Sequence, residues 1–234
     1  MDVDSLLPGD ELDALFSFTV WMYPSRELAA TLLARVIAER PGAGRDGWLA
    51  ALWRGGSTVR APGGARRRLR ELDEVLRGQV TLTVGLDHPL VRRDARRLRV
   101  LRSEVQRACI GAVLRTLAPK PRAVLLMASL FGLAVGRIAE ITGMSPARAH
   151  EDLRQATRAL EDYLGARCQH LDRRNVCSCA GRVGVALASG FIDWPEHDDH
   201  DGRAAPDRAS PEIVDLVAGL PRFRWERRSR TCSP

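Results

Sequence analysis

The strongest constraint on the fold lies in residues 117–164, where apolar stretches at helical spacing are separated by glycine and proline. The spacing predicts one helix over residues 122–131, a second over 134–142 and a third over 146–163. Three short helices joined by tight turns are typical of a helix-turn-helix. An unrelated three-helix cluster is the alternative interpretation.

Glycine and proline supply the expected helix ends. Gly132 and Gly143 follow the first two helices, and glycine accepts the left-handed backbone that ends a helix. Ser145 and Pro146 are residue types favoured at the cap and first position of the third helix.

The remaining sequence also indicates an all-α fold. Aromatic residues make up only 5% of the 234 residues, and few segments alternate apolar and polar residues as strands do. Two helices are expected within residues 11–40, separated at Pro24 and Ser25, and a short one over residues 48–53. A long helix is expected from Pro89 to Leu117, capped by Asp87.

Charge and cysteine content limit the class of protein. The formal net charge of +7 favours a polyanionic or acidic partner. The longest apolar stretch, residues 123–135, is too short to span a bilayer, so we expect no membrane insertion. Five cysteines, an odd number, and an N-terminus without a secretory leader indicate the cytoplasm.

Several segments resemble region 4 of extracytoplasmic-function sigma factors, a group of the sigma-70 family. They are L-A-P-K-P-R-A-V-L-L at 117–126, G-L at 132–133, I-A-E-I-T-G at 138–143 and A-T-R-A-L at 156–160. A weaker likeness to region 2 covers residues 11–16 and 27–33 and the dipeptide at 48–49. The resemblance implies an all-α initiation factor with two helical domains on a linker.

That resemblance implies a binding partner for each domain. The first domain would bind core RNA polymerase and melt the promoter, and the second would bind the upstream promoter element. The expected polymerase-binding residues are Leu28, Leu32, Leu33 and Val36. The chain departs from the pattern after Trp53, where glycines at 55, 56, 63 and 64 interrupt the melting helix.

The predicted third helix supplies the candidate DNA contacts. Arginine suits phosphates or guanine, glutamine suits adenine, and glutamate can accept from cytosine. The expected contact residues are Ser145, Arg148, His150, Glu151, Arg154, Gln155 and Arg158. The neighbouring carboxylates Glu151 and Asp152 would repel phosphate. A protein-binding helix is therefore the alternative to a DNA-binding one.

A cysteine- and histidine-rich segment follows the helix-turn-helix. Its candidate metal ligands are Cys168, His170, Cys177 and Cys179, which match a structural Zn²⁺ site in type and number. Reversible thiol oxidation, with nearby arginines lowering the thiol pKa values, is a second interpretation. Packing of small apolar side chains is a third, and Cys109 is expected in the core.

Composition and the sigma-factor resemblance together predict five segments along the chain. They are a region 2-like domain at 8–60, a basic linker at 61–88, a region 4-like domain at 89–166, the cysteine-histidine extension at 167–192, and an acidic linker with a basic tail at 193–234. Motifs for catalysis are not found, so enzymatic activity is not expected. The predicted function is transcription initiation with core RNA polymerase, promoter DNA and an anti-sigma factor or other regulator as partners. A sigma-derived regulatory protein without promoter melting is the alternative.

Overall fold

A computed structural model describes residues 9–56, 64–78, 95–193 and 212–225, and only the backbone of 95–97. The expected start of the long helix at Pro89, with its cap at Asp87, lies outside these residues, as does most of the acidic linker. The described chain forms ten helices and no strand, which confirms the all-α prediction. They are α1 (Gly9–Met22), α2 (Arg26–Glu39), α3 (Gly44–Gly56), α4 (Ala65–Arg77), α7 (Ala95–Leu114), α8 (Pro119–Phe131), α9 (Val135–Thr142), α10 (Pro146–Leu164), α11 (Cys179–Ala188) and α12 (Ile213–Ala218).

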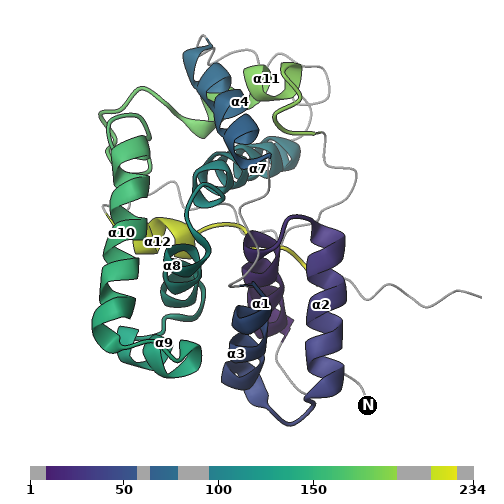
Figure 1. Cartoon of the computed structure of the whole chain (residues 1–234). Helices are drawn as coiled ribbons and strands as arrows, with labels where there is room; N and C mark the ends of the chain where they lie inside the picture. Colours follow the sequence, from purple (N-terminus) through teal and green to yellow (C-terminus); the bar gives the residue numbers. More distant parts are fainter. Residues whose placement is uncertain (1–8, 57–63, 79–94, 194–211, 226–234) are drawn as a thin grey trace, which may run out of the picture.

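The helices form three groups (Figure 1). The first three pack on one another, α8 to α10 form a second group, and α4 and α11 cover α7 at one end of the molecule. The break between α1 and α2 lies where it was predicted. The Ser25 hydroxyl caps α2 by accepting from the Leu28 amide at 3.2 Å.

The first and second groups share one hydrophobic core. Helix α1 packs against α8, and the rings of Phe18 and Phe131 meet edge to face at 6.2 Å. Helix α3 packs against α9, where the Trp53 indole N–H donates to the Thr142 carbonyl at 3.1 Å. The predicted domain boundaries stay a prediction, and the two groups are in direct contact.

The C-terminal strap, which we define as residues 212–225, joins these two groups. Its helix α12 packs on α8 and α10, and the chain then runs to α1 (Figure 1). There the Phe223 amide donates to the Ser17 hydroxyl at 2.8 Å, and the Trp225 amide donates to Asp13 at 2.7 Å. The start of the predicted basic tail is therefore packed against the body of the protein.

Helix α12 begins after Glu212, which makes no capping side-chain hydrogen bond. Within the described chain, no helix combines the length and the apolar character needed to cross a membrane.

Candidate nucleic-acid interface

Two glycines set the turns of the helix-turn-helix. Gly132 ends α8 with φ of 61° and Gly143 ends α9 with φ of 70°, both in the left-handed region. An L-residue with a side chain rarely adopts this backbone, so glycine at these positions allows α8, α9 and α10 to follow one another closely. The structure confirms both predicted helix ends.

The third helix begins as its sequence predicts. The Ser145 hydroxyl accepts from the Arg148 amide at 3.2 Å, and Pro146 occupies the first helical position. One face of α10 packs against α8 and α9 through Ala149, Ala156 and Leu160, all fully buried. The opposite face of the helix is therefore turned to solvent.

All seven predicted DNA contacts lie on that exposed face. They are Ser145, Arg148, His150, Glu151, Arg154, Gln155 and Arg158. The structure brings them together along the first four turns of α10, as a helix entering the major groove requires.

Each arginine of this face already has a carboxylate partner. Arg154 pairs with Glu151 at 2.6 Å, and Arg158 lies 4.0 Å from Asp162. The hydrogen bond from Arg154 lowers the pKa of Glu151, and the same contact raises the pKa of Arg154. Both groups are therefore charged at neutral pH, and their charges cancel locally.

The placement of Asp152 corrects one expectation. This carboxylate was expected beside Glu151 on the DNA-facing surface, but its side chain is 0% exposed. It forms an ion pair with Arg148 at 2.9 Å. Asp152 therefore does not face DNA phosphates, and Glu151 alone brings negative charge to this surface.

Comparison with known families assigns this part of the chain. Residues 107–160 match the family described as Sigma-70, region 4. Residues 107–160 are a sigma-70 region 4 domain. A region 4 domain implies binding to the −35 element of promoter DNA by a sigma-factor-like protein. The family match covers less than a quarter of the chain. No curated protein and no solved structure matches the chain.

The C-terminal strap reaches the exposed face of the region 4 domain. Val214 of α12 shares a surface hollow with His150 and Arg154 of α10. The sequence did not indicate where the tail lies, and the structure places this part of it beside the predicted DNA-contacting side chains.

The expected polymerase-binding residues are divided between surface and core. Leu28 is 41% exposed and Leu32 is half-buried, so both offer surface on α2. Leu33 and Val36 are buried and contribute to the core of the first group of helices. In this arrangement only Leu28 and Leu32 can contact a partner.

The predicted metal ligands gather in the loop between α10 and α11. The backbones of Cys168 and Cys177 are paired in an isolated β-bridge, and the Cys177 amide donates to the Arg167 carbonyl at 3.2 Å. Both thiols are free. The Cys179 thiol lies 3.4 Å from the His170 imidazole. These four side chains, which we call the cysteine–histidine cluster, line one apolar cavity of about 20 Å³.

The cysteine–histidine cluster has the residue types of a zinc site, but its side chains are not arranged around a metal position. Thiolates and imidazole are the ligands of structural Zn²⁺. As the side chains stand, however, no three histidine, cysteine, aspartate or glutamate residues within the described part of the chain are placed to hold a metal ion. The zinc site therefore stays a prediction.

The expected low thiol pKa values are contradicted for two of the cysteines. Burial raises the pKa of Cys168 and raises that of Cys179 well above its usual range. The arginines expected to lower these values contact other groups: Arg167 stacks on Tyr163, and Arg174 pairs with Asp172 at 2.6 Å. The interpretation as a thiol redox sensor assumed lowered thiol pKa values, and this assumption does not hold at Cys168 and Cys179.

Cys109 belongs with this cluster, which the sequence did not reveal. It comes from α7 and lines the same cavity as the four predicted ligands. It is half-buried, and burial together with the neighbouring thiols raises its pKa. Its distance along the chain from Cys168 hides the proximity in the sequence.

Proposed function

We propose that this protein is a transcription initiation factor of the extracytoplasmic-function type that binds core RNA polymerase and directs it to specific promoters. The observation that carries the proposal is the region 4 domain, with seven polar or charged side chains exposed on one face of α10. Sigma factors act in the cytoplasm, and we propose the same location for this protein. We also propose an anti-sigma factor or other regulator as a partner.

Promoter contact would proceed by exchange of ion pairs. An exposed surface pair such as Arg154 with Glu151 contributes little to stability, because solvent screens it. A bidentate contact from arginine to guanine provides about 1–3 kcal/mol of discrimination, which exceeds that cost. Once it is released from Arg154, Glu151 can accept a hydrogen bond from cytosine, and Gln155 can form hydrogen bonds with adenine. These three side chains are the proposed readers of sequence.

One observation favours the second candidate function, a sigma-derived regulator without promoter melting. Trp48 and Trp53 stand where the resemblance places the melting helix, and both indoles are buried. Trp48 donates to the Arg40 carbonyl at 2.8 Å, and Trp53 donates to Thr142 of the region 4 domain. With both rings held in this way, neither is available to capture an unpaired base.

Two assays separate these functions. The first captures core RNA polymerase on the immobilised full-length protein, and the second measures run-off transcription from genomic promoters. The initiation-factor proposal predicts both capture and promoter-dependent transcripts. Polymerase capture without any transcript would contradict initiation and support the regulator. Arg154→Ala is the matched variant, since it should lose transcripts while retaining polymerase capture.

A further inference from the structure

The C-terminal strap lies along one edge of the DNA-contacting face of α10. Its helix α12 packs on α8 and α10 and lies beside α10 in Figure 1. Val214 of α12 completes a surface hollow whose other residues all belong to α10, among them the predicted DNA contacts His150, Glu151 and Arg154. The strap therefore occupies space directly next to these three side chains.

DNA recognition by α10 requires that space. The major groove of B-form DNA is about 12 Å wide, and an α-helix with its side chains is about 10–12 Å across. One helix therefore fills the groove. Helix α12 cannot enter the groove beside α10, so DNA that contacts His150 and Arg154 meets the strap.

Apolar side chains hold α12 in this position. Ile213, Leu216 and Val217 are buried and belong to the hydrophobic core that also contains residues of α8 and α10. Leu220, which follows the helix, is buried as well. The strap is therefore a packed part of the fold, and it leaves α10 only when these contacts are broken.

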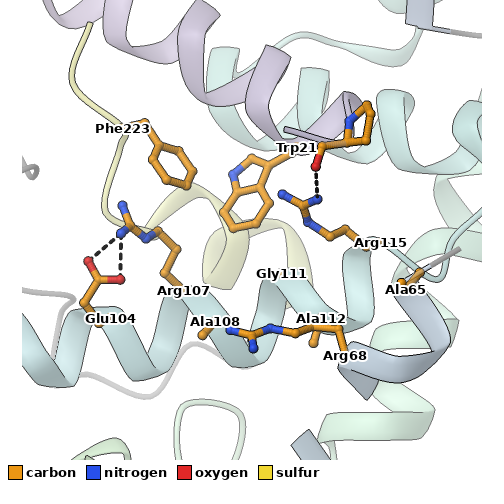
Figure 2. Close-up of a pocket in the computed structure, with 12 residues that line it drawn as sticks. Trp21, Ala65, Arg68, Glu104, Arg107, Ala108, Gly111, Ala112, Arg115 and Phe223 are labelled. Atoms are coloured by element: carbon orange, nitrogen blue, oxygen red, sulfur yellow. Dashed lines mark hydrogen bonds and ion pairs between the residues drawn. The ribbon is translucent and has the colours of Figure 1, made fainter. Parts of the chain in front are cut away.

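The other end of the strap is attached to α1 and α7. Figure 2 shows the Phe223 ring beside Trp21 of α1 and next to Arg107 of α7, whose guanidinium lies 4.2 Å from the centre of that ring. The Arg222 guanidinium donates to the Asp10 carbonyl at 2.9 Å. Only residues 219–222 separate α12 from Phe223, so loss of the Phe223 contacts also loosens α12.

We propose that the C-terminal strap is an autoinhibitory element that keeps α10 out of the major groove until the strap detaches. This inference rests on the proposed promoter binding through α10 and adds a means of regulating it. Only the fraction of the protein with a detached strap binds promoter DNA. The apparent dissociation constant therefore equals the intrinsic constant divided by that fraction.

Fluorescence anisotropy with the full-length protein and a labelled DNA duplex tests this inference. The duplex is selected from a randomised pool by a strap variant, so that the closed state does not limit the selection. Phe223→Ala and Leu216→Ala should each bind it at least about tenfold more tightly than the wild type, because each raises the detached fraction. Ala218→Ser is the matched control, since Ala218 is exposed on α12, and its affinity should equal that of the wild type.

Two further measurements assign the effect to the strap and to α10. In the wild type, saturating duplex should accelerate hydrogen–deuterium exchange over residues 212–225, because DNA selects the detached state. Adding Arg154→Ala to Phe223→Ala should remove the gain in affinity, because the gain depends on contacts made by α10.

The outcomes separate this inference from the proposed function. Circular dichroism establishes that each variant is folded, and the exchange measurement on the wild type needs no variant. Unchanged or weaker DNA binding by a folded strap variant would overturn autoinhibition while leaving promoter binding intact, as would slower exchange of the strap on DNA. If no duplex is selected even by the strap variants, promoter recognition by α10 is itself refuted, and the inference with it.

Discussion

Phe223→Ala should release the C-terminal strap from the body of the protein. The Phe223 ring is only 9% exposed and makes edge contacts with Trp21 at 5.3 Å and with Phe16 at 6.4 Å. The Arg107 guanidinium lies over the same ring, 4.2 Å from its centre. The Arg26 guanidinium also lies over this ring, at 5.7 Å. Truncation removes all four contacts at once and leaves the neighbouring backbone hydrogen bond to Ser17 unsupported.

The size of the effect follows from these contacts. A Phe→Ala change in a core costs about 3–5 kcal/mol. Phe223 lies at the edge of the core, so we expect the lower end of that range, about 3 kcal/mol. Since each 1.4 kcal/mol is a factor of about ten, the population with the C-terminal strap detached should rise roughly a hundredfold.

Hydrogen–deuterium exchange measures this population directly. In the variant, the amides of Phe223 and Trp225 should exchange roughly a hundredfold faster, provided that exchange follows local opening. Val176→Ala is the matched control, because Val176 is 77% exposed and its truncation should leave the exchange unchanged. If exchange over residues 212–225 is the same in Phe223→Ala and the wild type, the ring does not hold the C-terminal strap.

Four further predictions address the region 4 domain, α7 and the cysteine–histidine cluster. Arg154→Ala should weaken promoter binding by about 1–3 kcal/mol in a gel-shift titration, and an unchanged affinity would place this residue off the DNA. Gly111→Ala should lower thermal stability by about 1–3 kcal/mol, since the new Cβ would lie 2.3 Å from Trp21, whereas Gly136→Ala, with open space around it, should not. Arg148→Ala should lower the stability measured by urea denaturation by about 1–3 kcal/mol, because it removes the ion-pair partner of a buried carboxylate, and an unchanged stability would refute this. Metal analysis of the reduced protein should find about one zinc per chain if the cluster is a structural site, and less than about half an equivalent would argue against it.

The helix-turn-helix could be predicted from the sequence because its signals are local. Gly132, Gly143 and Ser145 each act within a few residues of their own position, through backbone freedom or a capping hydrogen bond. The apolar spacing then defines the buried face of α10 and, by exclusion, its exposed face. For this reason all seven candidate contacts were placed correctly on the surface.

Contacts between distant segments left no such signal. Trp53 donates to a carbonyl 89 positions away, and the Phe223 amide donates to Ser17 across 206 positions. No local spacing encodes such a pairing, because it depends on how whole helices pack. The same limit explains why Cys109 was assigned to the core without its thiol neighbours.

The ion pairs of α10 divide its arginines into two kinds. The partners of Arg154 and Arg158 are exposed carboxylates, so each pair can open at little cost. Arg148 pairs with the fully buried Asp152, and moving it to a phosphate would leave that carboxylate without its ion-pair partner at a cost of about 1–3 kcal/mol. A phosphate contact at most balances this cost, since a charge-assisted hydrogen bond contributes about 1.5–3 kcal/mol. Arg148 therefore supports the fold of the region 4 domain, and Arg154 and Arg158 are the arginines of α10 that leave their partners for promoter DNA most readily.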